Sequence, residues 1–553
     1  MASHKPIIYQ VLPRLLGNQN QRRKKNGTME ENGVGKFADI NYGVLKQLKR
    51  MGVSHVWYTG ILRHATQTDY SAFGIPRQHA GVVKGRAGSP YAVTDYYDID
   101  PDLAVNVPER MQEWKALLER THEEGLKVVI DFIPNHVARE YHSICKPQGV
   151  RDLGEDDDPQ KHFSIENNFY YCWGQPFQPQ FPVCDYREDI ARATGNDQFS
   201  ASPGVNDWYE TVKLNYGIDY CDAGGRSNHF EPHPDTWNKM LHILLFWAAQ
   251  GIDAFRCDMA EMVPVEFWQW AIGQVKAQYP ELLFIGEVYN PHQYRDFIAA
   301  GFDYLYDKVG LYDTLFDMLH SDGWASEITR QWQSTADILP HMLYFLENHD
   351  ELRIASEFFA GDAKRAIPAL MVSAWLHQGA LMIYEGQEFG CQGMDQEGFS
   401  GRDGRTTIFD YWCVEALRKG FFSRKELSDE ELQLEQQYRL IGTITAKERA
   451  ISKGEMFDLM YANTHLHHHQ FAFLRKYKTD LLLCVVNFAD EPVDIDLHIP
   501  QHAFDYLQIT TGEHTAKNLL TGEQSSLLLH PENPLRLHIN KHNGILLKLK
   551  RIS

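Results

Sequence analysis

The chain of 553 residues contains no apolar run long enough to cross a membrane, and it has no CxxC pair. The apolar stretch near its start, residues 7–12, is too short for the hydrophobic region of a secretory signal peptide. A chain of this size does not need disulfide bonds, so its 8 scattered cysteines are predicted to be small buried side chains. These absences predict a cytoplasmic protein with no membrane partner.

Positive charge is also scarce, because 54 Lys and Arg residues stand against 74 Asp and Glu residues, a formal net charge of -20. A surface of that sign repels nucleic acid and anionic lipid, so neither is expected as a partner, whereas a neutral substrate is not disfavoured. Apolar residues make up 43% of the chain, which is ample core material for two or three domains. The sequence leaves the oligomeric state open.

Short apolar runs alternate with longer amphipathic stretches up to about residue 388, as in βα units around a parallel sheet. Eight parallel strands with intervening helices predict an α/β fold, a (β/α)₈ TIM barrel, whose catalytic groups lie at the C-terminal ends of the strands. The predicted strands are residues 7–12, 53–58, 127–132, 252–256, 282–285, 302–306, 342–346 and 381–384.

The spacing of these strands predicts the domain organisation. A long Gly-, Pro- and aromatic-rich stretch between the third and fourth strands indicates an inserted subdomain, placed at residues 138–225. The barrel is then expected in residues 1–137 and 226–447. Residues 448–553 form short alternating segments without helices between them, which predicts a C-terminal antiparallel β-sandwich domain.

Carboxylates end several of the predicted barrel strands. Arg256 and Asp258 are two residues apart on one strand and should face the same side, where the guanidinium favours an ionised Asp258. Glu287 ends an apolar run, an environment that suits a protonated carboxyl acting as general acid. Asp131 and Asp350 end two further strands. Converging carboxylates, one ionised and one protonated, are what retaining glycoside hydrolysis requires.

Four strand ends carry distinctive motifs: DFIPNH at 131–136, GIDAFRCD at 251–258, FIGEV at 284–288 and FLENHD at 345–350. Together they resemble the four conserved regions of the α-amylase family, glycoside hydrolase family 13, and the likeness extends over nearly the whole chain. The resemblance implies a barrel with an insertion after strand three and an antiparallel C-terminal domain. It also implies a retaining enzyme that hydrolyses α-1,4-glucosidic bonds in maltooligosaccharides or α-glucans and needs no cofactor for the chemistry.

The resemblance also implies three catalytic roles. Asp258 is similar to the nucleophile of that family, Glu287 to the acid/base, and Asp350 to the transition-state stabiliser that grips sugar hydroxyls.

Five further positions resemble residues that bind the sugar at the cleavage site. His136 and His349 match histidines that bond its hydroxyls, and Arg256 matches the arginine that positions the nucleophile. Tyr91 resembles the tyrosine that stacks on this sugar, because an aromatic face binds the apolar face of a pyranose. Asp95 resembles the aspartate that supports the site.

The sequence departs from the family pattern at two places. Glu261 and Met262 stand where many α-amylases have a Lys-His pair on the leaving-group side, and neither side chain can donate a hydrogen bond. Short maltooligosaccharides are therefore expected to be used better than starch. Asn135 resembles a calcium-ligating asparagine, but Lys213 stands close to where the cation would lie. A structural calcium ion stays an open alternative.

Two other functions are weighed against hydrolysis. Transfer of the glycosyl group to another sugar stays open, because it differs only in how the acceptor side excludes water. A noncatalytic glycan-binding protein is disfavoured by the intact carboxylates.

Two aromatic or histidine-rich clusters receive structural interpretations. The aromatic residues 169–173 are predicted mainly as the insertion's own core, with a sugar platform as the alternative. The histidines in residues 465–469 are interpreted as incidental, because alternate residues of a strand point to opposite faces.

Overall fold

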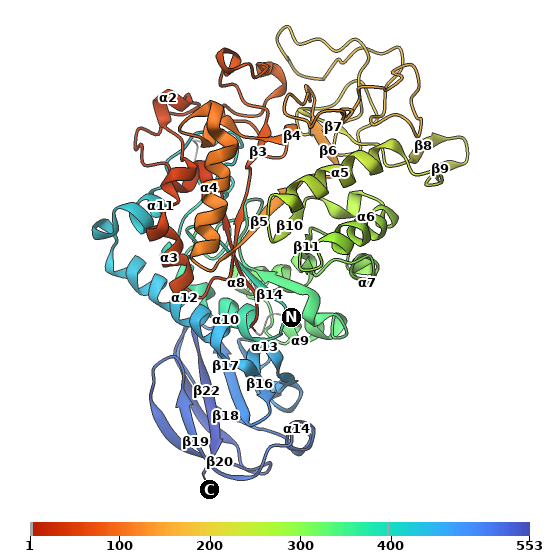
Figure 1. Ribbon diagram of the computed structural model, residues 1–553. Coiled ribbons are helices and arrows are strands. Elements are labelled where there is room, and N and C mark those ends of the chain that lie inside the picture. Colours follow the sequence, from red (N-terminus) through yellow and green to blue (C-terminus); the bar gives the residue numbers. More distant parts are fainter. Residues whose placement is uncertain (1–3, 395–397, 553) are drawn as a thin grey trace.

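The computed structural model describes residues 4–394 and 398–552, and a closed barrel of parallel strands lies at its centre (Figure 1). The eight strands follow one another around the barrel in sequence order, with β14 closing against β1, so the predicted (β/α)₈ fold is confirmed. Each predicted strand agrees with the observed one to within two residues at either end. The barrel strands are β1 (Ile7–Val11), β2 (His55–Tyr58), β5 (Lys127–Phe132), β10 (Ala254–Cys257), β11 (Leu283–Gly286), β12 (Tyr304–Tyr306), β13 (Met342–Phe345) and β14 (Ala380–Tyr384).

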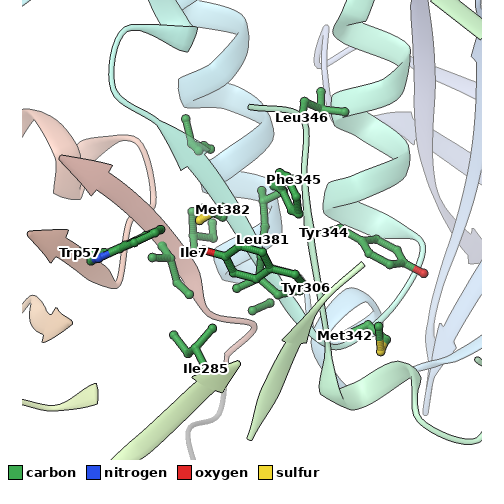
Figure 2. Packing of buried hydrophobic residues seen from close by; sticks show 14 of the residues in the cluster. Ile7, Trp57, Ile285, Tyr306, Met342, Tyr344, Phe345, Leu346, Leu381 and Met382 are labelled. Atoms are coloured by element: carbon green, nitrogen blue, oxygen red, sulfur yellow. The ribbon is translucent and has the colours of Figure 1, made fainter. Parts of the chain in front are cut away.

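The barrel interior is packed with apolar side chains from different strands. In β1, Tyr9 pairs with Ile383 on one side and with Val56 on the other, and all five residues of the strand are buried. Figure 2 shows Ile7 and Tyr306 among the side chains of this cluster. Strands covered on both faces need no polar alternation, which is why they read as continuous apolar runs.

Helices surround the barrel and bury an apolar face against it. The longest, α12 (Asp429–Lys447), begins at a capping box in which Ser428 and Glu431 satisfy each other's backbone N–H groups. The other helices are α1 (Pro13–Leu16), α2 (Met29–Asn32), α3 (Tyr42–Arg50), α4 (Arg110–Glu123), α5 (Asp235–Ala249), α6 (Val265–Gln278), α7 (Tyr294–Ala299), α8 (Asp313–His320), α9 (Glu327–Ser334), α10 (Ile367–Trp375), α11 (Glu415–Leu417), α13 (Arg449–Lys453) and α14 (Gln501–Leu507). Within residues 4–394 and 398–552, none of the helices is both long and apolar enough to cross a membrane.

Two long segments extend from the end of the barrel at which the strands have their C-termini. The expected insertion follows β5, and it is tied down by β6 (His136–Ala138) paired with β7 (Thr211–Lys213). It also carries the hairpin of β8 (Ile218–Asp222) and β9 (Gly225–Asn228). Figure 1 shows it at the end of the barrel opposite the C-terminal domain.

A second long segment, which the sequence analysis did not predict, follows β2. It contains the hairpin of β3 (Leu62–His64) and β4 (Val93–Ile99).

The insertion's aromatic residues divide into packed and exposed ones. Tyr170 lies edge-on to both Phe199 and Tyr220, so it belongs to the insertion's core, as predicted. Trp173 is 62% exposed.

The C-terminal part is antiparallel, as predicted, and follows α13 directly. Its main sheet has the order β15, β16, β17, β22, β19, β20, and β18 pairs with β21 in a second small sheet. We propose that the barrel ends with α12, at residue 447. The strands are β15 (Glu455–Asp458), β16 (Gln470–Tyr477), β17 (Asp480–Asn487), β18 (Val493–Leu497), β19 (Gly512–Asn518), β20 (Gln524–Leu529), β21 (Leu535–Ile539) and β22 (Asn543–Arg551).

Candidate active site

The predicted catalytic carboxylates lie at the C-terminal ends of barrel strands. Asp258 directly follows β10 and Glu287 directly follows β11, and these two strands are hydrogen-bonded neighbours in the barrel. Asp350 lies beyond the end of β13, on the loop at the same end of the barrel. Parallel strands deliver their C-terminal residues to one edge, so the fold itself brings these groups together.

Arg256 is the centre of the site. Its guanidinium is fully buried, and Nη1 lies 2.7 Å from Asp258 Oδ1 while Nη2 lies 2.8 Å from Glu287 Oε2. The sequence analysis placed these two carboxylates in separate environments, an arginine for one and an apolar run for the other. The structure corrects this: β10 and β11 are adjacent, so a single planar guanidinium reaches both.

Two further side chains contact Arg256 and its neighbour Asp131. Arg256 Nη1 is 3.5 Å from Asp131 Oδ1, and Trp57 Nε1 donates to Asp131 Oδ2 at 3.1 Å. Arg256 Nε also donates to Tyr306 Oη at 3.2 Å. The sequence analysis missed Trp57 and Tyr306 as site residues, although both stand at the ends of predicted strands, which is the signal that marks this edge.

The carboxylates differ in their exposure to solvent and in the direction in which their pKa values are shifted. Burial raises the pKa of Asp258 well above the ordinary value, Arg256 opposes that shift, and the negative charge of Glu287 adds to it. Asp350 has a side chain that is 45% exposed, and His349 Nε2 lies 2.9 Å from its Oδ2. Burial would raise the pKa of Asp350, but the His349 contact and nearby arginines bring it below the usual value.

Glu287 is held by hydrogen bonds from two directions. The backbone N–H of Met259 donates to Oε2 at 2.8 Å, and the Tyr289 hydroxyl donates to Oε1 at 2.7 Å. Met259 is in the left-handed region with φ 43°, a conformation that costs energy for a residue with a side chain and is typical of active sites. Sequence analysis missed Tyr289, two residues after the predicted acid.

Glu261 has a structural contact of its own. Its Oε2 accepts hydrogen bonds from the backbone N–H groups of Tyr289 and Asn290, both at 2.9 Å. This carboxylate therefore fixes the loop that carries Tyr289. Its neighbour Met262 lines a cavity of about 430 Å³ that also touches Tyr220 and Arg226 of the insertion.

The rings of His349 and Tyr91 pack against each other. Their rings stack with centroids 5.1 Å apart and an interplanar angle of 20°. His349 Nδ1 lies 2.7 Å from Gln10 Nε2, which fixes the ring. The Tyr91 hydroxyl is buried, and among the described residues it has no hydrogen-bond partner. An unpaired buried hydroxyl beside a stacking face suits a polar ligand.

His136 and Asp95 have different surroundings. Burial lowers the pKa of His136 to about 3, with Lys213 acting in the same direction, so its ring is neutral and can both donate and accept. Asp95 is fully buried and pairs with Arg63 at 3.0 Å and with the Ser143 hydroxyl at 2.6 Å. The contacts of Asp95 thus join β4 to the start of the insertion.

The residues at Asn135 do not fit a calcium ion. Lys213 Nζ donates to Asn135 Oδ1 at 2.7 Å and lies 2.6 Å from Asp197 Oδ1, and Lys213 is 2% exposed. Calcium prefers six to eight oxygen ligands, whereas here a buried ammonium already pairs with Asp197, the one acid that contacts it among the described residues. Lys213 therefore lies beside Asn135, close to where the cation would lie, as the sequence analysis expected.

Two other cavities are present, one beside the site and one apart from its residues. One of about 230 Å³ lies beside His349 and Asp350 and is bounded by the loop from Gly398 to Phe409, including Arg405. Another, of about 620 Å³, is lined by Cys391, Cys413 and α12 residues and contains none of the predicted site residues.

Comparisons with known proteins agree on one family. A family model described as the α-amylase catalytic domain matches residues 22–460. Neopullulanase 2 of Thermoactinomyces vulgaris is 21% identical over 98% of this chain and 77% of that protein. Oligo-1,6-glucosidase of Parageobacillus thermoglucosidasius is 21% identical over 69% of this chain and 65% of that protein. The solved structure of a maltogenic α-amylase from Thermotoga neapolitana superposes with a TM-score of 0.64 at 19% identity, covering 99% of each chain.

Proposed function

The chain belongs to the α-amylase family of glycoside hydrolases, and on that premise we propose that it hydrolyses α-1,4-glucosidic bonds in maltooligosaccharides with retention of configuration. The observation that carries the proposal is the pair of carboxylates, Asp258 and Glu287, held by the one guanidinium of Arg256. Two carboxylates at one site, one attacking and one transferring the proton, are the machinery of double displacement.

In the proposed reaction Glu287 gives its proton to the leaving glycosidic oxygen while Asp258 attacks the anomeric carbon. The resulting glycosyl ester on Asp258 is then hydrolysed by a water molecule from which Glu287 removes a proton. Tyr289 and the Met259 N–H keep the Glu287 carboxylate in one orientation through both steps. Apart from the water that is consumed, the proposed steps use only side chains of this chain.

The substrate contacts follow from the same geometry. Tyr91 offers a stacking face and an unpaired hydroxyl, and His349 and Asp350 lie beside it for the sugar hydroxyls. Neutral His136 can bond further hydroxyls. One relative is named a neopullulanase and another an oligo-1,6-glucosidase, so the linkage is to be set by experiment.

The mechanism is tested by following maltotriose hydrolysis by proton NMR from the first seconds. We expect the α-anomer of the product to appear first and to mutarotate later, because two inversions at one carbon restore its configuration. A β-anomer appearing first contradicts double displacement. Parallel incubation with pullulan, isomaltose, trehalose and sucrose identifies the linkage, and chromatography of longer products detects transfer to sugar.

A further inference from the structure

A cluster of metal-ligating side chains lies at the junction of the barrel and the C-terminal domain, away from the active site. Asp322 is in the loop between α8 and α9, and His468 and His469 immediately precede β16. The two segments are fixed to each other by backbone hydrogen bonds, since Ala325 N donates to the His468 carbonyl at 2.9 Å. Figure 1 shows α9 and β16 next to each other at this border.

Both imidazole rings face the same carboxylate. His468 Nε2 lies 3.4 Å from Asp322 Oδ2, and His469 Nδ1 lies 3.7 Å from Asp322 Oδ1. The sequence analysis interpreted these histidines as incidental because alternate residues of a strand point to opposite faces. The rule for strands does not apply to this pair, because both residues precede the first residue of β16, and the two rings stack with centroids 3.7 Å apart.

We propose that Asp322, His468 and His469 bind a divalent transition-metal ion of the zinc class. Donor atoms about 2.0–2.2 Å from a four-coordinate ion are separated from one another by roughly 3.3–3.6 Å. The two nitrogen–oxygen separations are close to that range, so an ion can enter with little rearrangement. Two imidazoles and a carboxylate favour zinc, cobalt, nickel or copper over calcium or magnesium, which prefer oxygen ligands.

The neighbouring histidines show what distinguishes this pair. His467 Nε2 is 2.9 Å from the Met460 carbonyl, so that ring is already engaged by the protein. Within the described part of the chain, neither His468 nor His469 has a side-chain hydrogen bond to any group. The three ligands are 35–69% exposed, which gives an ion access from solvent and leaves its remaining positions to water.

The bound ion would join two segments about 145 positions apart in sequence, the loop after α8 and the entry to β16. It is therefore expected to stabilise the junction of the two domains without taking part in catalysis. A ligand that binds the folded state alone raises the temperature of unfolding as its concentration rises.

The proposal is tested on untagged, chelator-stripped full-length protein. Zn²⁺ is titrated by calorimetry and Co²⁺ by the visible absorption of the ion in a nitrogen-containing site. We expect one site in the wild type and a loss of affinity of about tenfold or more in Asp322→Asn and in His469→Gln, because each lacks one ligand. His465→Gln, in the same tract but outside the cluster, is the matched control and should bind as the wild type does.

The double variant His468→Gln/His469→Gln gives the sharpest outcome. It should lose the Co²⁺ absorption and the rise in unfolding temperature with Zn²⁺, while its rate on maltotriose stays unchanged in metal-free buffer. Wild-type binding by the double variant would show that the ion sits elsewhere, for example on the active-site carboxylates. An equal loss in His465→Gln would show unspecific binding by the histidine tract. Either result overturns the proposal.

Discussion

At the scale of single residues, Asp258 and Glu287 are the most direct targets for substitution. Asp258→Asn removes the proposed nucleophile, and Glu287→Gln removes the proton donor, while both amides keep the size of the side chain. Each variant is expected to lower kcat by about 10²–10⁴ or more, with the fold intact. Turnover of maltotriose and the far-UV circular dichroism of both variants check this. A folded variant that keeps more than about a tenth of the wild-type rate contradicts the assignment.

The elevated pKa of Asp258 sets the acid side of the pH profile. Protonation makes this carboxyl unreactive, so a pKa that burial raises means that activity is lost at higher pH than for an ordinary aspartate. We expect kcat/KM for maltotriose to fall as the pH decreases, well before about pH 4. Asp350, whose pKa is lowered, stays ionised through that range and does not set this limb.

The control for this prediction is stability. Circular dichroism over the same pH range should show a folded protein where activity has already fallen. A rate that stays constant down to about pH 4 would mean that Asp258 keeps an ordinary pKa in the free enzyme.

At the scale of elements, Lys213 joins β7 to the end of β5 and to the insertion. Replacing it in Lys213→Met leaves the Asp197 carboxylate and the side-chain oxygen Oδ1 of Asn135 without this partner. Unfolding free energy is expected to fall by about 1–3 kcal/mol, the usual effect of leaving a buried polar group unpaired, because Asn135 is buried whereas Asp197 is exposed to water. Thermal unfolding of the variant measures this, with Lys161→Met, an exposed lysine of the insertion, as the matched control.

The same experiment tests whether calcium has a role at this place. Added CaCl₂ should leave the unfolding temperature and the activity of the wild type unchanged, because the ammonium occupies the position beside Asn135. A clear rise in the wild type's unfolding temperature with calcium would refute this reasoning.

The elements of the barrel could be predicted because the strands are short, mostly apolar runs, and several of them, such as β10 and β11, are followed directly by a charged residue. The hairpin of β3 and β4 could not, since β4 carries Asp95 and Asp98, whose charges are neutralised by Arg63 and Arg110. Such a pairing between distant segments leaves no local pattern. The ion pair between Arg256 and Glu287 was not predicted for the same reason. It depends on the distance between side chains on two different strands, which only the folded chain defines.

At the scale of the whole molecule, we expect the chain length of the preferred substrate to depend on how the insertion and the barrel meet. Glu261 is turned to backbone N–H groups, and Met262 lines the cavity beside the insertion without a group to donate. Each missing hydrogen bond weakens glucan binding by about 0.5–1.5 kcal/mol. Sugar units of a longer glucan on the leaving-group side are therefore expected to add little to its affinity. We expect kcat/KM per bond to be higher on maltotriose to maltoheptaose than on soluble starch.

Met262→His provides the matched variant, because it returns one donor to the cavity without changing the proposed catalytic carboxylates. It should improve the use of the longer substrates relative to maltotriose. Starch used an order of magnitude better than the oligosaccharides by the wild type would point to a glucan-binding surface elsewhere, such as the exposed Trp173.

The shared guanidinium also faces the negative charge of the site at every stage of the proposed reaction, while the covalent bonds change. Under the proposed roles, Asp258 loses its negative charge when it becomes an ester, and Glu287 gains one at the same moment by giving up its proton. Arg256 Nη1 faces the first oxygen and Nη2 the second, so the positive charge always has one anion opposite it. The two halves of the reaction therefore proceed in a buried pocket whose net charge does not alter, and little reorganisation of the surroundings is required between them.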